Sequence, residues 1–333
     1  MIREGVVFSR ILFFIVIAIL PGYSSDLPAT HTLLEQGRLD LAVGTLQDQV
    51  RNEPNNADAY NLLCRAYLMA DKWNPAISAC ERAVNLDPEN SQYHLWLGRS
   101  YGQKAAHVGP FTAARVAGQV RDEFETAVRL NPRSVDARDD LADFYLEAPW
   151  VVGGGQDKAA AQASEIQKLE PAQADLLRAR IAEKKKDFAT AETEIKQAIQ
   201  DSRGAAGPWI ALARLYRRTG RLDEMEHAIE RATAPSLNRP DVLTRAAELL
   251  IESKRNLPAA KDLLERYLSS PNPSEDAPVF KARYLLGTLL EQQGQQEQAI
   301  TQYRAALALS AEFTPARNAL DRLSNHARNE GVR

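Results

Sequence analysis

The sequence predicts an all-α protein, a solenoid of about eight stacked antiparallel helix hairpins followed by a C-terminal capping helix. Residues that end or open helices recur with a period near 34 residues. Ala, Leu, Glu, Gln and Arg, which lose little rotamer freedom in a helix, recur throughout the 333 residues. No run of alternating β-branched and aromatic residues indicates a strand. Together these observations favour growth by repetition over one compact core.

The period is visible in two independent series of residues. Four dipeptides that end helical stretches have prolines separated by 34, 44 and 39 residues: Glu53-Pro54, Asp87-Pro88, Asn131-Pro132 and Glu170-Pro171. The residues that open the second helix of each unit are separated by 34, 44, 39, 32, 34, 35 and 39 positions: Ala42, Ala76, Val120, Ala159, Ala191, Met225, Ala260 and Ala299. A 34-residue unit with two insertions explains both series. One such hairpin cannot bury both of its faces, so it must stack on its neighbours.

The unit 57–90 shows the pattern most clearly. Its two helices are marked by apolar residues at helical spacing: Tyr60, Leu63, Cys64 and Tyr67 in the first, and Ala76, Cys80, Ala83 and Leu86 in the second. Asp87-Pro88 ends the second helix, because proline cannot donate the next helical hydrogen bond. Small residues at the crossing allow the two backbones to approach closely.

This pattern resembles the tetratricopeptide repeat. The aromatic–Leu–small–Tyr run of that family is matched by Tyr60, Leu63, Cys64 and Tyr67, and again by Trp209, Leu212, Ala213, Tyr216 and Gly220. In the unit 91–134, His94 replaces the aromatic residue, and we expect it to have a structural role. The resemblance covers nearly all of the chain after its N-terminal segment. It implies a right-handed superhelix that binds other proteins, with the first helices lining the concave side.

We expect residues 1–24 to be a signal peptide and residues 25–333 to form the solenoid. The units are expected at 25–56, 57–90, 91–134, 135–171, 172–205, 206–239, 240–279 and 280–313, followed by a cap at 314–328. The first unit has lost part of its first helix. Units 172–205 and 240–279 match the repeat weakly.

The N-terminal segment predicts export. Arg3 and Arg10 precede the apolar run Ile11–Leu20, and Gly22 and Ser24 suit cleavage after Ser24. This run is too short to cross a hydrocarbon core of ~30 Å, which needs about 20 apolar residues. We therefore expect a cleaved signal peptide and an exported, periplasmic protein. The alternative is an uncleaved segment that anchors the chain in the inner membrane, if Arg10 extends to the membrane surface.

Charge and motifs argue against several function classes. A formal net charge of −3 and a pI near 6.0 give no global attraction to nucleic acid. The five histidines have no spacing that would hold zinc, and no catalytic constellation is present. We therefore expect no enzyme activity, no metal and no cofactor. The glycine-rich run at 153–158 lacks the spacing of a phosphate-binding loop, and its glycines are expected to permit a tight turn.

Two consecutive units carry insertions between their first and second helices. The unit 91–134 gains about ten residues and the unit 135–171 about five, relative to the 34-residue period. Stacked hairpins place equivalent turns side by side, so both insertions should emerge at one edge. They carry Phe111, Trp150 and Val151. We favour packing of these side chains against one another in a small cluster; the alternative is an exposed apolar surface that binds a partner.

The resemblance also implies that one position in each first helix faces the concave groove. These positions are Arg65, Arg99, Asp143, Arg180, Arg214, Glu248 and Thr288. The four arginines could bind the carboxylates of an acidic segment through bidentate hydrogen bonds. The favoured alternative is that Asp143 and Glu248 pair with arginines of neighbouring units on a solvated face.

The chain has two cysteines, Cys64 and Cys80, one on each helix of a single unit. A disulfide requires Cα atoms within ~7 Å, and Cys80 is expected about one turn away from the point opposite Cys64. We therefore favour two buried thiols, while a disulfide remains the alternative in an oxidising compartment.

These features predict a non-catalytic scaffold outside the cytoplasm that binds a partner protein or peptide through the concave groove or the inserted turns. The alternative is an accessory subunit of a periplasmic complex for polysaccharide synthesis, secretion or proteolysis, with catalysis on another chain. An enzyme built on the insertions would need a defined cluster of titratable groups, which Lys104, His107, Glu147 and Asp157 do not provide. No nucleic-acid partner is expected, and membrane contact is expected only through an uncleaved N-terminal segment.

Overall fold

The computed structural model describes residues 27–237, 239–271 and 273–330, which fold into seventeen α-helices and two short 3-10 helices. In this part of the chain, the β-structure consists of one isolated bridge between Ser274 and Ala277. The predicted all-α repeat fold is therefore confirmed. The predicted signal peptide, residues 1–24, lies outside the described residues.

Sixteen of the described α-helices form eight consecutive hairpins. Their bounds are α1 Leu27–Glu35 and α2 Leu39–Asn52, α3 Ala57–Met69 and α4 Trp73–Leu86, α5 Ser91–Ala106 and α6 Pro110–Leu130, α7 Val135–Glu147 and α8 Gln156–Ile166, α9 Pro171–Lys184 and α10 Phe188–Asp201, α11 Ala206–Arg218 and α12 Leu222–Ala232, α13 Pro240–Glu252 and α14 Leu257–Leu268, and α15 Val279–Gln292 and α16 Gln296–Leu307. The 3-10 helices are η1 (Trp150–Val152) and η2 (Pro235–Leu237), and α17 (Thr314–Glu330) follows the last hairpin and packs on α16.

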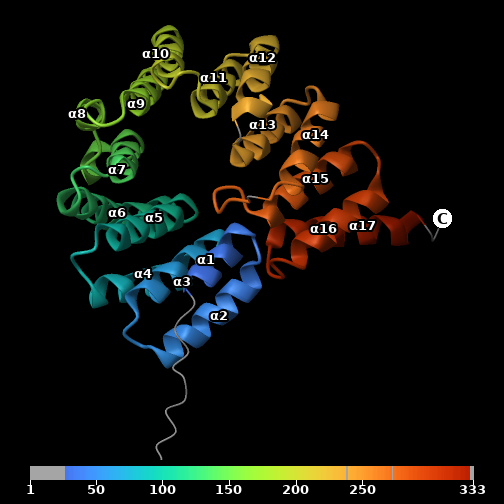
Figure 1. The fold of residues 1–333 in the computed structure, drawn as a ribbon, viewed down its shortest axis with the longest axis horizontal. Coiled ribbons are helices and arrows are strands. Elements are labelled where there is room, and N and C mark those ends of the chain that lie inside the picture. The colour runs from blue at the N-terminus through green and yellow to red at the C-terminus, as the bar shows by residue number, and fades with distance from the viewer. Residues whose placement is uncertain (1–26, 238, 272, 331–333) are drawn as a thin grey trace, which may run out of the picture.

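The hairpins stack so that the first helix of each faces a central opening and the second lies outside it (Figure 1). A continuous cluster of buried apolar side chains runs through all eight hairpins. Most of the predicted small residues at the helix crossings, such as Ala76, Ala191 and Ala299, are fully buried and permit close backbone approach. Burial of apolar surface between neighbours supplies the main favourable free energy of such a fold.

Local signals determine where several helices begin. The side chains of Asn56, Ser134 and Asp187 each accept a hydrogen bond from a backbone amide in the first turn of the following helix. Such caps satisfy amide groups that have no partner within the helix. Pro171 and Pro240 occupy first-turn positions, where the absent N–H costs no hydrogen bond.

The repeated tyrosine of the first helix has a consistent structural role. In α5, α7 and α11 its hydroxyl donates a hydrogen bond to a glutamate on the preceding second helix, in the pairs Tyr101–Glu81 at 2.7 Å, Tyr145–Glu125 at 2.9 Å and Tyr216–Glu192 at 2.9 Å. In α3 the Tyr67 hydroxyl instead accepts from the amide of Gln47 at 2.8 Å. Burial, followed by the hydrogen bond to the glutamate, raises the pKa of Tyr101 and Tyr145. The tyrosines of α5, α7 and α11 therefore join consecutive hairpins as neutral hydrogen-bond donors.

The two ends of the solenoid meet and close it into a ring, which the repeat pattern did not predict (Figure 1). The turn between α1 and α2 lies against the start of α15, and a Cβ atom added to Gly37 would be 2.8 Å from the nitrogen of Val279. The amide of Asp40 donates to the carbonyl of Leu309 at 3.2 Å, and its carboxylate accepts from the amide of Ala311 at 2.7 Å. Backbone groups of both ends thus contribute directly to the closure.

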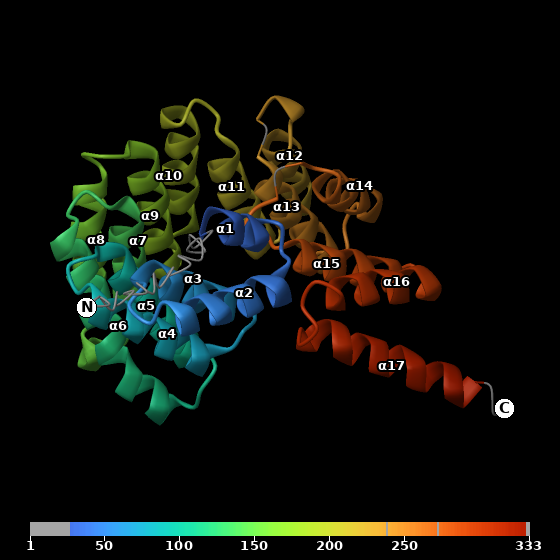
Figure 2. The ribbon, with the colours of Figure 1, turned by 60° about the horizontal axis from the view of Figure 1, so that its bottom comes forward.

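Ion pairs add to this closure. Glu275, in the loop between α14 and α15, accepts a hydrogen bond from Arg65 of α3 at 2.7 Å and lies 3.3 Å from the imidazole of His31. Lys72 pairs with Glu312 on the same side of the ring. Figure 2, which is turned about the horizontal axis relative to Figure 1, shows α1 and α2 beside α15 and α16. Helix α17 extends outward at the C-terminal end.

The first insertion takes a different form from that expected, whereas the second lies in the turn between two helices as predicted. In the unit 91–134 the extra residues lengthen the helices, giving 16 residues in α5 and 21 in α6, with a short turn between them. Pro110 starts α6, and the alanine-rich sequence after it has high helix propensity. In the unit 135–171 the insertion forms η1 and a glycine turn.

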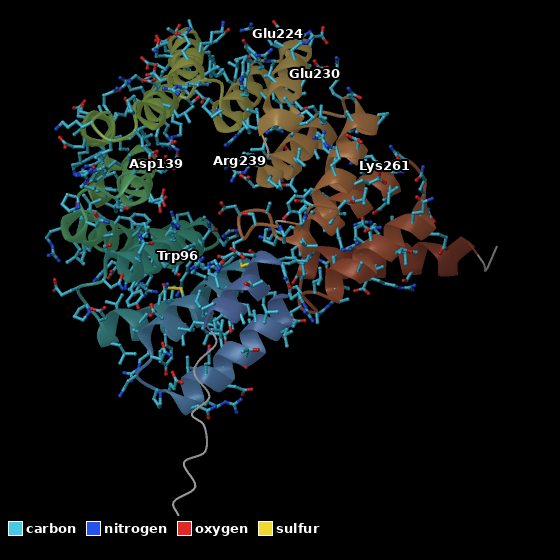
Figure 3. All side chains as sticks on the ribbon, in the orientation of Figure 1. Trp96, Asp139, Glu224, Glu230, Arg239 and Lys261 are labelled. Atoms are coloured by element: carbon cyan, nitrogen blue, oxygen red, sulfur yellow. A yellow bond between two sulfur atoms is a disulfide. The ribbon has the colours of Figure 1, made fainter. Side chains whose placement is uncertain are left out.

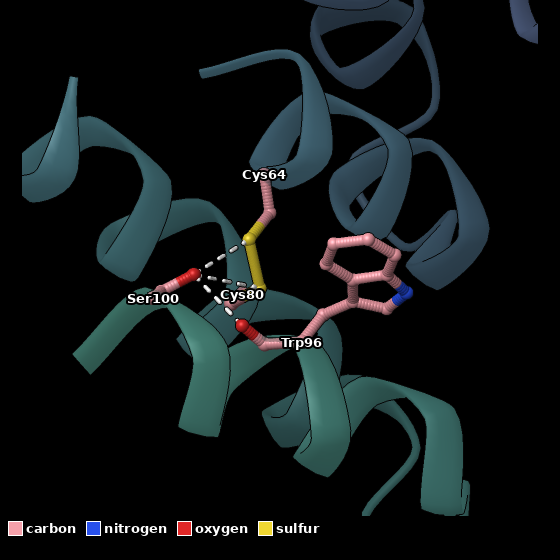
Figure 4. Close-up of a disulfide and its surroundings, with 4 residues drawn as sticks. All are labelled: Cys64, Cys80, Trp96 and Ser100. Carbon is pink, nitrogen blue, oxygen red and sulfur yellow. Dashed lines mark hydrogen bonds between the residues drawn. A yellow bond between two sulfur atoms is a disulfide. The ribbon is translucent and has the colours of Figure 1, made fainter. Parts of the chain in front are cut away.

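Cys64 and Cys80 form a disulfide, with Cα atoms 5.3 Å apart (Figure 4). The favoured prediction of two free thiols is therefore wrong. Helices α3 and α4 cross closely at Cys64 and Cys80, both fully buried, and this brings the two Cα atoms within bonding range. Ser100 of the next hairpin lies 3.2 Å from the sulfur of Cys64 and donates to the carbonyl of Trp96 at 2.8 Å.

Candidate functional site

A groove of about 760 Å³ separates the two segments that carry insertions. One wall is formed by α5 and the first half of α6, and the other by the end of α7 and η1. Alanines of α5 and α6 form much of its surface, together with Pro149, Val151 and Val152 from the second segment. We call this feature the insertion groove. The two insertions therefore emerge together at one edge of the ring, as the stacking of hairpins predicts.

Large apolar side chains are exposed beside the insertion groove. Phe111 is 95% exposed, Trp150 83% and Val151 66%, and the other exposed large hydrophobic side chain among the described residues is Leu41 on α2. The favoured prediction that the inserted residues pack on one another is therefore wrong for these three. Although η1 lies against part of α6, these three side chains face solvent and do not bury one another.

The glycine-rich turn after η1 has no free amides for a phosphate. The amides of Gly153, Gly154 and Gly155 donate to the carbonyls of Trp150, Pro149 and Tyr145, at 3.0, 3.1 and 2.8 Å. A Cβ atom at Gly154 would lie 1.8 Å from the carbonyl oxygen of Ala148, so only glycine fits there. The turn holds the second wall of the groove in place.

The four predicted arginines lie at different places in the ring. Arg99 lines the insertion groove and donates to Asp140 at 2.5 Å, whereas Arg65 belongs to the ring closure. Arg180 pairs with Asp139 and lies 3.4 Å from Asp143, so one of the expected pairings between neighbouring units forms. These three guanidinium groups are held by carboxylates of the chain itself.

Arg214, the fourth predicted arginine, lines a second cavity of about 670 Å³ beside α11, α13 and α15. The cavity contains charges of both signs, including Arg245 and Glu248. Partial burial, and then the nearby Glu252, raise the pKa of Glu248. Figure 3 shows Arg239 and Asp139 beside the central opening and Glu224, Glu230 and Lys261 on the outer side. The predicted arginine stripe is therefore not one continuous cationic surface.

Three carboxylates lie in the insertion groove on one face of α7: Asp140, Asp143 and Glu147. They follow one another at helical spacing, and Arg99 is the one basic residue in the lining. Partial burial and the neighbouring carboxylates together raise the pKa of Asp143 to about 6, against the opposing effect of Arg180. The groove therefore combines an apolar surface with an acidic side.

Sequence reasoning named Phe111, Trp150, Val151 and Arg99 at this groove but missed the functional potential of Asp140 and Glu147. The spacing of acidic residues along α7 was a visible signal for both. It could be connected with the insertions only once the stacking of α7 against α5 and α6 was known.

His94, which replaces an aromatic residue of the repeat, is buried and structural. Its two ring nitrogens lie 2.6 Å from a carboxylate oxygen of Glu123 and 2.9 Å from the carbonyl of Pro88. Both partners are acceptors, so a protonated imidazole satisfies both contacts. The hydrogen bond to Glu123 is the largest effect on His94, and its pKa is raised above the usual value of 6.5.

We expect the His94 contact to make stability depend on pH. Because the folded-state pKa is raised, the contribution is complete below pH 6.5 and disappears as the pH rises through the folded-state value. Urea unfolding between pH 5.5 and 8 should show a loss of about 1 kcal/mol in the wild type that His94→Gln lacks. The same pH dependence in the variant would contradict this role for His94.

The described residues contain no group of three or more His, Cys, Asp or Glu side chains placed to hold a metal ion. In the same residues, no helix combines the length and apolar character needed to cross a membrane.

Comparisons with known proteins identify repeats of a known family in parts of the chain. Models of the tetratricopeptide repeat match residues 33–99, 206–234 and 280–313. Among solved structures, yeast Tom70 is similar over 87% of this chain and 59% of its own, with 15% identity and a TM-score of 0.55. A thermophilic tetratricopeptide-repeat protein of Thermus thermophilus matches over 68% of this chain and 97% of its own, with 21% identity and a TM-score of 0.45.

A further solved structure, a tetratricopeptide-repeat protein of Parabacteroides merdae, covers 79% of this chain and 97% of its own, with 14% identity and a TM-score of 0.47. The Tom70 likeness supports the solenoid fold, and the family models match at the N-terminal hairpins and at two later ones. The chain therefore contains tetratricopeptide repeats and folds as an α-helical repeat solenoid.

Proposed function

We propose that this chain is a non-catalytic scaffold that binds a segment of a partner protein in the insertion groove. The tetratricopeptide repeat is in general a non-catalytic module for protein–protein interaction. One observation carries the choice of surface. Of the four exposed large hydrophobic side chains of the described residues, Val151 lines this groove, and Phe111 and Trp150 directly follow its lining residues Pro110 and Pro149 in the sequence. Apolar surface gathered at one place is typical of an interaction site, whereas scattered exposed residues are not.

The groove also joins the two surfaces that the sequence suggested. Arg99 belongs to the concave positions of the first helices, and Val151 belongs to the inserted turns, yet both line the same groove. A partner segment in the groove would contact both. Tight packing around such a segment would remove Trp150 and Val151 from water, which is a favourable contribution to binding.

We further propose that the chain acts outside the cytoplasm, exported by residues 1–24 and released into a periplasm, or anchored to the inner membrane if that segment is not cleaved. The Cys64–Cys80 disulfide supports this location, because disulfides persist in oxidising compartments. Fractionation of cells, followed by mass spectrometry of the mature N-terminus, tests both points. A cytoplasmic protein with an intact N-terminus and free thiols would contradict the proposal.

A photo-crosslinking phenylalanine analogue at position 111 tests the binding surface. Phe111 is 95% exposed and directly follows Pro110 of the groove lining, so its replacement should leave the fold unchanged. We expect it to crosslink a partner in cells, and we expect Val151→Glu to reduce that crosslink at least tenfold, because a charge in the groove must be desolvated when the partner binds. The measurement is the yield of the crosslinked species.

Leu41 provides the matched control. It is 48% exposed on α2 and takes no part in the insertion groove. The analogue at position 41 should not crosslink the same partner, and Leu41→Glu should leave the crosslink from position 111 unchanged. Equal crosslinking from both positions, or no effect of Val151→Glu, would refute the proposed surface. The identity of the captured protein then separates a general scaffold from an accessory subunit of a periplasmic enzyme complex.

A further inference from the structure

The chemistry of the insertion groove restricts the kind of segment that it can bind. Its apolar part is built mainly from alanines, such as Ala106, Ala113 and Ala117, which leave room in front of the helices. A segment that fills this room must bring large apolar side chains of its own. Pro149 and Val151 supply the opposite apolar wall. The occupant is therefore an apolar or amphipathic segment.

The charges in the groove restrict the occupant further. The carboxylates of Asp140, Asp143 and Glu147 share one face of α7, and Arg99 is the one basic residue in the lining. Asp140 is neutralised by Arg99, whose Nε donates to it at 2.5 Å. Glu147 is 75% exposed at the groove edge and pairs with Lys184 at 2.7 Å.

Asp143 is the least compensated of the three carboxylates. The cation within ion-pair distance of it is Arg180, which lies 3.4 Å away and also pairs with Asp139. Burial, together with the negative charges of Asp139, Asp140 and Glu147, raises the pKa of Asp143 to about 6. A further positive charge in the groove would therefore stabilise the ionised form of Asp143.

We infer that the insertion groove selects an amphipathic protein segment that carries lysine or arginine beside large apolar residues. This inference rests on the proposed function and adds the chemical class of the partner. An ammonium or guanidinium group beside Asp143 supplies the missing positive charge, while the apolar face of the segment covers Val151 and the alanines. An acidic segment would add a like charge to α7 and is disfavoured.

Synthetic peptides test this selectivity directly. Three fluorescently labelled amphipathic helices of equal length share one apolar face of leucines and carry lysine, glutamine or glutamate at their polar positions. Fluorescence polarisation with the purified full-length chain should show the lysine peptide binding about fivefold more tightly than the glutamine peptide, with the glutamate peptide weakest. Reversal of this order would overturn the inference.

Variants locate the effect in the groove. Asp143→Asn should remove most of the preference for lysine over glutamine, whereas Asp262→Asn, at an exposed aspartate on α14, should leave it unchanged. In the wild type the preference should weaken as the pH falls through about 6, because protonation removes the charge of Asp143. If Asp143→Asn alters the circular dichroism spectrum, Glu147→Gln at the exposed end of the same face serves as the second variant.

The outcomes separate this inference from the proposed function. Equal binding of all three peptides that is abolished by Val151→Glu would overturn the charge selectivity and leave the groove as the binding surface. An affinity for the lysine peptide that Val151→Glu leaves unchanged would place binding elsewhere and overturn both. Absence of binding by all three peptides, with the crosslink from position 111 intact, would overturn the selectivity alone.

Discussion

Replacement of Cys64 and Cys80 together by alanine is expected to lower the free energy of unfolding of the N-terminal hairpins by about 3 kcal/mol. The two cysteines are separated by 16 positions, and closing a loop of about this length removes conformational entropy from the unfolded chain. Both sulfurs are buried at the crossing of α3 and α4, so their loss also leaves space in the core. Urea unfolding followed by circular dichroism measures the change.

The location of the effect is a second readout. Repeat proteins are stabilised mainly by contacts between neighbours, so amide exchange should accelerate most in α3, α4 and α5 and least in α11 and α12, on the opposite side of the ring. Cys64→Ala alone should cost nearly as much as the double change, because either one removes the bond. Unchanged urea stability in the double variant, or equal acceleration throughout the ring, would show that the disulfide contributes little.

Gly98→Val is expected to destabilise the protein by about 2 kcal/mol, through overpacking between α5 and α6. A Cβ atom on Gly98 would lie 2.5 Å from the ring of Phe124, so the two helices would have to separate or the ring would have to move. Phe124 is buried, with few alternative positions for its ring. The same urea measurement tests the change. We also expect amide hydrogen exchange to accelerate throughout α5 and α6.

Two further variants make this prediction specific. Phe124→Leu in the Gly98→Val background should restore part of the stability, giving a coupling between the two sites in a double-mutant cycle. Gly118→Ala is the control. Gly118 lies in α6, the helix that carries Phe124, and nothing lies within 4 Å of a Cβ atom added there, so this change should be neutral or stabilising. An equal loss of stability in Gly118→Ala would show that the loss in Gly98→Val does not arise from contact with Phe124.

The repeat architecture could be predicted because each unit carries its own local signals. Proline at helix ends, small residues such as Ala76, and the Tyr67 and Tyr216 positions each report on structure within one or two hairpins. The cysteine pair was misjudged, because a crossing of two helices must be known to about an ångström before a disulfide can be accepted or excluded. Helical spacing along one helix does not give that distance.

Local sequence signals could not predict that the ring closes or that the apolar side chains beside the groove are exposed. Closure depends on small rotations between hairpins that add over eight units, and it brings Glu275 to Arg65, 210 positions away in the sequence. The exposure of Trp150 depends on how far η1 stands from α6. The sequence identified the residues at the groove, but not whether they pack on each other, because that depends on the separation of two backbones.

The contact between the first and last hairpins has a consequence for the evolution of the chain. An open array can gain or lose a unit by duplication or deletion and retain its remaining interfaces. Here one unit fewer would leave a gap that separates Asp40 from Ala311 and Glu275 from Arg65, and one additional unit would make the two ends overlap. The circumference is thus set by the number of units, and selection for closure would act against unequal recombination within the gene. Change in length is then confined to segments that project from the ring, which is where the two insertions lie.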